Sequence, residues 1–300
     1  MDSVARGSVV VGVDGSRQAI AAVRWAARFA SDERRTLTLV HACGGLADWA
    51  GLEDVMSSER SARGRAVLVE AWDAVRERFG DLHAVSVVDP GQPGGVLVEA
   101  SQTAAVVVVG GRGSGSLARM LLGSVADQVA RSAWCPVVVV HELEERTEVA
   151  PGGGLADERP VVVGVDGSPA SVAAIDFAFR VASVRGRQVE LLHATWDLRE
   201  RASGVLDTRS YEAKVEVEER AERMVAETVA GFGEKYPDVT VLEDYRNGDA
   251  AEELVRASAR ASLVVVGAHG HNRLHALVLG SVSSAVAARA ECPVAVVRPV

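Results

Sequence analysis

Apolar residues along the chain form short valine-rich runs that alternate with longer stretches of helical periodicity. Residues 8–14 are nearly continuous valine, a pattern that predicts a parallel strand buried on both faces. From Arg17 to Ala30 apolar residues recur at helical spacing, which predicts a helix with Ser16 as its N-cap. By the same criteria we predict strands at 36–42, 84–88, 105–109 and 137–141, helices at 59–79, 94–103 and 124–132, and an irregular segment at 44–57.

The second half of the chain repeats this order of elements. Asp14 and Asp166 are 152 positions apart, whereas Gly110 and Gly267 are 157 apart, so the second copy has about five extra residues after its second strand. Its predicted strands are 161–166, 188–194, 239–244, 262–266 and 294–298, with helices starting at 168 and 250 and a long helix near 211–232. We therefore predict two domains, 1–143 and 160–300, joined by an acidic, glycine-rich linker at 144–159.

Strands that alternate with helices at this spacing predict right-handed crossovers and an α/β, Rossmann-like fold, with a five-stranded parallel sheet in each half and helices on both faces. Ligands of such sheets bind at the carboxyl ends of the strands. Asp14 and Gly110 follow or end the first and fourth strands, so both are expected at that edge. The closing strands are valine-rich edges, which predicts that they pair as an intrachain pseudo-dimer, with a homodimer of chains as an alternative.

A glycine-rich loop after the fourth strand of each half has the composition of a phosphate-binding site. Its spacing is Gly, two residues, Gly, nine residues and Gly-Ser, starting at Gly110 and at Gly267. The first glycine would let backbone approach a ligand, and the second would adopt a positive φ that turns amides toward an anion. Ser124 and Ser281 would cap the following helices, whose first amides favour phosphate. Neither loop has the Gly-Lys-Ser/Thr ending of a Walker loop.

Composition and charge narrow the classes of partner. The chain has 300 residues and a formal net charge of −9, without a lysine- or arginine-rich run, which argues against a nucleic acid as main partner. No apolar run approaches the roughly 20 residues of a membrane span, and no signal-peptide pattern precedes the first strand, so we expect a cytoplasmic protein that does not bind membranes.

Three motifs together resemble the universal stress protein family. They are VVVGVDGS at the start of each half, the Gly-x2-Gly-x9-Gly-Ser loop, and the closing strand CPVVVV. The resemblance covers nearly the whole chain and is to the tandem two-domain, ATP-binding form common in actinobacteria. It implies strand order 3-2-1-4-5, one ATP site per half across the ends of strands one and four, and a role in the stress response.

The resemblance also implies the residues that would bind ATP. Asp14 and Asp166 would lie near the ribose and the nucleotide-bound Mg²⁺, and Ala42 and Ala194 would flank the adenine. The other implied binding residues are Gly12, Gly110, Arg112, Gly113, Ser114, Gly115, Gly123, Ser124 and Val125 in the first half, and Gly164, Gly267, His269, Gly270, His271, Gly280, Ser281 and Val282 in the second.

The sequence contains no recognisable catalytic constellation, because it has neither a nucleophile elbow nor a lysine in either loop. We therefore expect a nucleotide-dependent binding module that acts on an unidentified protein partner, and not an enzyme. Two alternatives stay open: a slow ATPase or nucleotidyl-transferring enzyme on the same fold, and a scaffold that associates without binding nucleotide.

Overall fold

A computed structural model describes residues 4–44, 53–111, 122–141, 159–195, 223, 225–227, 229–270 and 279–299. The first half contains β1 (Val9–Gly12), α1 (Arg17–Asp32), β2 (Leu37–Ala42), α2 (Glu53–Phe79), β3 (Ala84–Asp89), α3 (Pro93–Ala100), β4 (Val106–Gly110), α4 (Ser124–Ser132) and β5 (Val137–Val140). The second half contains β6 (Val161–Gly164), α5 (Pro169–Arg185), β7 (Val189–Thr195), β8 (Val241–Asn247), α8 (Ala250–Ser258), β9 (Leu263–Gly267), α9 (Ser281–Arg289) and β10 (Val294–Val297). No helix in these ranges is long and apolar enough to cross a bilayer.

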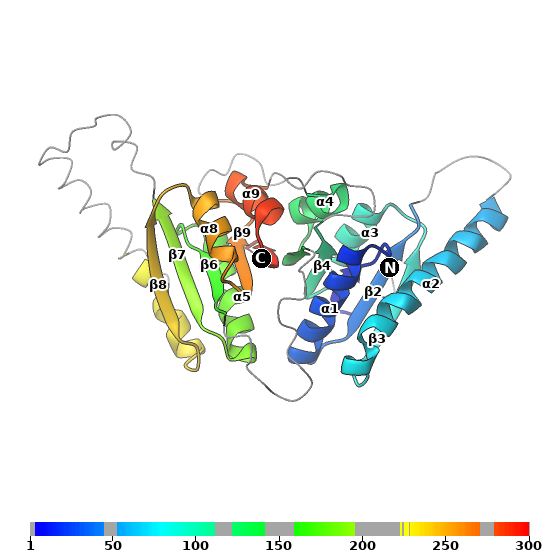
Figure 1. Cartoon of the computed structure of the whole chain (residues 1–300), viewed down its shortest axis with the longest axis horizontal. Coiled ribbons are helices and arrows are strands. Elements are labelled where there is room, and N and C mark those ends of the chain that lie inside the picture. Colours follow the sequence, from blue (N-terminus) through cyan, green and yellow to red (C-terminus); the bar gives the residue numbers. More distant parts are fainter. Residues whose placement is uncertain are drawn as a thin grey trace, which may run out of the picture.

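The strands form one continuous sheet in the order β3-β2-β1-β4-β5-β10-β9-β6-β7-β8 (Figure 1). Each half has the predicted order 3-2-1-4-5 with parallel neighbours, so the predicted α/β fold is confirmed. The valine runs are buried because helices cover both faces: Val9, Val10 and Val11 of β1 have no exposed surface. Their continuous apolar pattern thus reflects a central position in the sheet.

The two closing strands join the halves, as expected from their valine-rich edges. β5 and β10 pair antiparallel, with Val138 opposite Ala295. These two residues occupy equivalent positions in the repeats, so a local two-fold axis passes between them. Pairing inside the chain removes an apolar sheet edge from each half.

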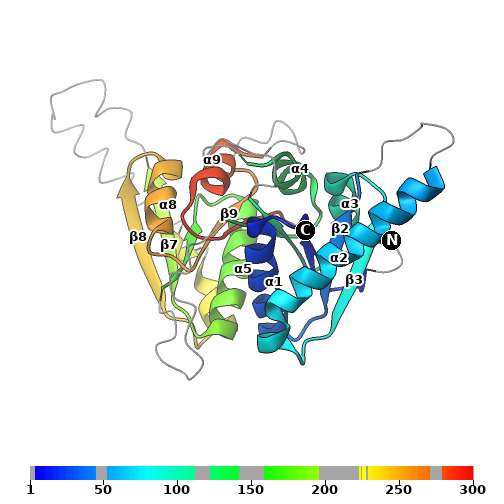
Figure 2. The ribbon, with the colours of Figure 1, turned by 45° about the vertical axis from the view of Figure 1, so that its right-hand side comes forward.

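Helices cover the two faces of the sheet in different ways. On one face α1, α2 and α5 pack over a single core that includes residues of both halves, among them Val11 and Val163. On the other face α3 and α4 cover a core of the first half, while α8 and α9 cover one of the second. α1 and α5 lie side by side in the middle of the molecule (Figure 2).

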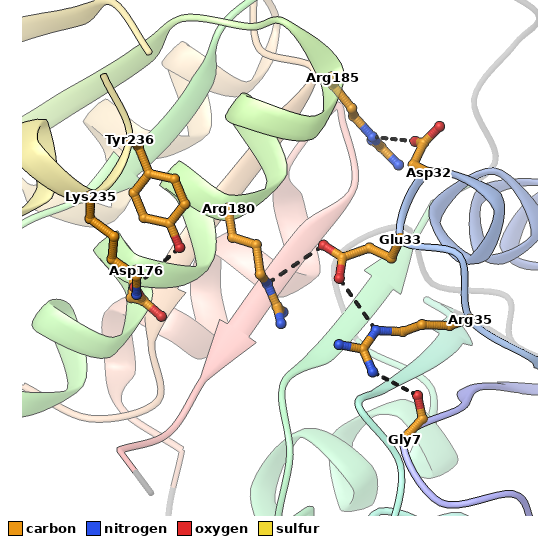
Figure 3. Close-up of polar contacts among 9 residues, drawn as sticks. All are labelled: Gly7, Asp32, Glu33, Arg35, Asp176, Arg180, Arg185, Lys235 and Tyr236. Carbon is orange, nitrogen blue, oxygen red and sulfur yellow. Dashed lines mark hydrogen bonds and ion pairs between the residues drawn. The ribbon is translucent and has the colours of Figure 1, made fainter. Parts of the chain in front are cut away.

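The contact between α1 and α5 combines aromatic rings with ion pairs. Phe29 stacks on Phe177 across the halves, with ring centroids 6.2 Å apart. Arg185 of α5 meets Asp32 of α1, with 2.9 Å between Nε and Oδ2 (Figure 3). Beside this pair, Glu33 forms an ion pair with Arg180 of α5, with 3.6 Å between Oε1 and Nε. The halves are therefore joined by helix packing as well as by the sheet.

Three predicted segments differ from the structure or lie wholly or partly outside the described residues. α2 starts at Glu53, so the segment expected to be irregular is helical from that residue on. The long second-half helix expected near 211–232 is described only in part, and its described residues 223, 225–227 and 229–235 are helical. The expected linker, residues 144–159, lies outside the described residues except for Arg159, and the domain boundaries stay a prediction.

Candidate functional site: two pockets at the carboxyl ends of the strands

Each half has a pocket where the carboxyl ends of its first, second and fourth strands meet the first turns of the helices that follow. The first pocket has a volume of about 200 Å³ and is lined by Gly12, Val13, Asp14, Ser16, Ala19, Val40, Ala42, Pro93, Leu97, Val109, Gly110, Gly123, Ser124, Val125 and Ala126. The second, of about 450 Å³, is lined by Gly164, Val165, Asp166, Ser168, Ser171, Leu192, Ala194, Ala250, Leu254, Val266, Gly267, His269, Gly270, Leu279, Gly280, Ser281, Val282 and Ser283.

These pockets bring together every expected binding residue that the structure describes. In the first half they come from β1, β2 and β4 and from the start of α4, and the second half repeats this arrangement. The remaining expected residues lie outside the described part of the chain: Arg112, Gly113, Ser114, Gly115 and His271.

α4 and α9 start at the pockets, and each has glycine rather than serine as its N-cap. Gly123 has φ −63° and ψ 151°, and Gly280 has φ −60° and ψ 154°, both extended. The expectation that Ser124 and Ser281 are the caps is wrong, because these serines are the first helical residues. A hydrogen bond from the Gly123 amide to the Gly111 carbonyl oxygen (2.8 Å) fixes this start, and Gly280 bonds to Ala268 in the same way.

A glycine cap has no side chain to accept the first helical amides. Among the described residues, none accepts a hydrogen bond from the amides of residues 124–126 or 281–283. At α1, in contrast, Ser16 Oγ accepts from the Ala19 amide at 3.1 Å, and Ser168 does the same for α5. Unlike α1 and α5, α4 and α9 therefore present uncapped amides and the positive end of the helix dipole to the pockets.

The first glycine of each loop has a packing role that the sequence reading did not foresee. A Cβ on Gly267 would lie 2.8 Å from the backbone carbon of Ala170, and one on Gly110 would lie 3.1 Å from that of Gln18. These glycines let the first turns of α1 and α5 rest against the ends of β4 and β9. The close approach is thus to a helix of the protein itself.

The second glycine of the second loop, Gly270, does not have the positive φ that we expected, so that prediction is wrong. A Cβ there would lie 2.8 Å from Asp166 Oδ2, which shows that Gly270 lets the loop lie against this carboxylate. Asp166 Oδ1 accepts the Ser168 amide at 2.9 Å, and Asp14 accepts that of Ser16 at the same distance. Both aspartates therefore shape the turn after the first strand while also lining a pocket.

One wall of each pocket was not predicted from the sequence. Pro93 and Leu97 of α3 line the first pocket, and Ala250 and Leu254 of α8 line the second. The signal was available, since a helix that follows the third parallel strand must start at the same edge of the sheet as the loops. Their apolar side chains make this wall suited to a flat, uncharged group.

His269 is the titratable residue that distinguishes the second pocket. Its Nε2 atom is buried and has no hydrogen-bond partner among the residues that the structure describes. Burial lowers the pKa of His269 below its usual 6.5, and the positive charge of Arg298 lowers it further. Arg298 itself donates hydrogen bonds to the carbonyl oxygens of Ala130 (2.8 Å) and Arg131 at the end of α4. At neutral pH this imidazole is therefore uncharged.

We expect His269 to make the ligand-free protein less stable in acid. Its pKa is lower in the folded state than in the unfolded chain, so the unfolded chain binds the proton first as the pH falls through 6.5. His269→Gln should reduce the loss of stability between neutral pH and pH values below 6.5, as measured by urea unfolding at several pH values. Identical pH profiles for the variant and the unmodified protein would show that His269 is not perturbed.

Comparison with known proteins agrees with this architecture. The sequence profile described as the universal stress protein family matches residues 6–141 and 158–298. A universal stress protein of Mycobacterium tuberculosis is 38% identical over 296 residues, covering 97% of this chain and 96% of its own. A Mycolicibacterium smegmatis universal stress protein is 38% identical over 299 residues, covering 97% of each chain.

A crystal structure of a universal stress protein from Archaeoglobus fulgidus superposes with a TM-score of 0.69 at 18% identity, covering 98% of both chains, and so supports the fold. The family profile matches twice and spans both halves of the chain, and each match contains one of the two pockets. The chain therefore belongs to the universal stress protein family.

Proposed function

We propose that this protein binds ATP in both pockets and works as a nucleotide-dependent regulatory module of the stress response. The observation that carries the proposal is the pair of glycine-capped helices, α4 and α9, whose first amides face a pocket. Such a helix start stabilises a bound phosphate through its amides and its dipole. The proposal includes a cytoplasmic location and a protein partner that responds to nucleotide occupancy.

The other walls of the pockets suit the rest of the nucleotide. Val40 and Leu97 in the first pocket, and Leu192 and Leu254 in the second, offer apolar surface to a base. Phosphates would lie between the loop after the fourth strand and the start of α4 or α9, whose amides can donate to their oxygens. The two ends of each pocket thus match the two chemical ends of ATP.

Magnesium would enter with the nucleotide. In the part of the chain that the structure describes, no cluster of three histidine, cysteine or acidic side chains could hold a metal alone. Mg²⁺ is commonly held by one or two carboxylates together with substrate phosphates. Asp14 and Asp166, which line the pockets, fit that role, since the phosphates would supply the remaining charge.

The proposal can be tested by removing one amide from each helix start without disturbing the helix. Proline is well tolerated at the first helical position, and Gly280 before Ser281 already has the extended conformation that a following proline requires. Ser281→Pro should therefore leave the protein folded. It should weaken ATP binding in the second pocket about 10- to 100-fold, the usual effect of losing a hydrogen bond to a charged group.

Ser124→Pro is the matched variant for the first pocket, because Gly123 has the same extended conformation. Isothermal titration calorimetry measures these effects, with MgATP titrated into the unmodified protein, both single variants and the double variant. Circular dichroism and thermal unfolding of the ligand-free proteins check the fold. Unchanged ATP affinity in a folded double variant would rule out phosphate binding at these helix starts.

A further inference from the structure

The two pockets occupy equivalent places but have unequal space. The first has a volume of about 200 Å³ and the second of about 450 Å³. Pockets that hold drug-sized ligands usually span roughly 300 to 1,000 Å³. The second pocket falls within that range, and the described walls of the first pocket leave less space.

One substitution between the repeats changes the α3 wall of the pocket. Pro93 is the first helical residue of α3, and its equivalent Ala250 is the first of α8. Both residues line their pockets. Alanine leaves out the pyrrolidine ring and adds a backbone N–H, for which no described residue is an acceptor. The second pocket therefore gains space and a donor at the same point.

Two further substitutions add hydroxyl groups to the second pocket. Ser171 and Ser283 stand where the first half has Ala19 and Ala126. Ser283 Oγ donates a hydrogen bond to the carbonyl oxygen of Gly267, at 2.5 Å. That carbonyl ends β9 and starts the glycine-rich loop, so the bond ties the loop to the first turn of α9. Ala126 cannot make the equivalent bond to Gly110.

Two other hydroxyls of the second pocket lie at the first turn of α5, and one of them, that of Ser168, reaches the start of the same loop. Ser168 Oγ lies 3.5 Å from the carbonyl oxygen of His269, at the outer limit of a hydrogen bond. Ser171 Oγ donates to the Ser168 carbonyl oxygen at 3.0 Å. Residues 267–269, held in place before a ligand arrives, lose less conformational entropy on binding, so more of their interaction energy contributes to affinity.

We propose that the second pocket is the high-affinity nucleotide site of the chain and fills first, and that Ala250 and Ser283 set this preference over the first pocket. The inference rests on the proposed ATP binding. The tandem chain would then respond over two ranges of ATP concentration, since one site fills at low ATP and the other at higher ATP. Equal repeats would respond over one range only.

Titration with MgATP tests the order of filling. The unmodified protein should show two binding steps of one equivalent each, separated by about tenfold or more in Kd, as the loss or gain of one good hydrogen bond would give. Ser281→Pro should weaken the tighter step, and Ser124→Pro should weaken the other. A single step of two equal sites, or loss of the tighter step in Ser124→Pro, would overturn the inference while leaving ATP binding in place.

Exchanging the residues between repeats tests what sets the preference. The pair Ala250→Pro and Ser283→Ala should weaken the tighter step about tenfold, and the pair Pro93→Ala and Ala126→Ser should strengthen the weaker one. Both pairs place residues that the fold already accepts at the equivalent position. An unchanged ratio of the two affinities in both exchanged proteins would show that these residues do not set it. If the unmodified protein took up no MgATP, the proposed function itself would fail.

Discussion

Replacing Asp32 by leucine is expected to destabilise the protein by about 3 kcal/mol, because it leaves the guanidinium of Arg185 buried without its carboxylate. The Arg185 side chain is 11% exposed and that of Asp32 is 27% exposed, which favours the lower end of the range for buried pairs. Burial lowers the pKa of Arg185 and Asp32 opposes that effect, so the carboxylate stabilises the charged form. Urea unfolding of the variant measures the loss.

The matched control removes both charges. Asp32→Leu combined with Arg185→Met should recover most of the stability, since neither charge of this pair is then left without its partner. Arg185 also lies over the Trp25 ring, 5.3 Å from its centroid, and methionine can fill that space with its flexible apolar chain. A double variant as unstable as the single one would show that the loss comes from packing and not from the unpaired charge.

Local sequence patterns predicted the elements well where a single segment determines them. The valine runs gave the strands, and Ser16 caps α1 as its position before the apolar period indicated. Ser168, where the second-half helix was expected to start, caps α5 in the same way. The Gly-Ser pairs before α4 and α9 misled because either residue can be the cap. The choice is made by the hydrogen bond from Gly123 to Gly111, or from Gly280 to Ala268, which closes the loop.

Contacts between the halves could not be read from the sequence in the same way. Asp32 and Arg185 are 153 positions apart, and the two helices that carry them meet across the sheet that β5 and β10 join. The valine-rich edges indicated that pairing. Which sides of α1 and α5 face each other, however, depends on the twist of the joined sheet. The α3 and α8 walls of the pockets were missed for a simpler reason, since no polar motif marks them.

The shared core beneath α1 and α5 makes the two halves mechanically dependent on each other. Phe29 is 1% exposed and lies between Trp25, at 5.1 Å between ring centroids, and Phe177 of the second half. On the opposite face each half has mainly its own core beneath its pocket. The ring of Phe29 therefore belongs to the hydrophobic interior of both halves, although it comes from only one repeat.

Phe29→Ala is expected to cost about 3–5 kcal/mol, the usual loss for removing a fully buried aromatic side chain. Because the core is shared, the loss should appear in both halves. Hydrogen exchange followed by mass spectrometry should show lower amide protection in β2 and in β7 together, with a single urea transition. Phe29→Leu, which keeps most of the apolar volume, is the control. It should lower amide protection in β2 and in β7 by a smaller amount. Reduced protection in β2 with unchanged protection in β7 would show that the halves unfold independently, and the cores on the opposite face would then set the stability of each half.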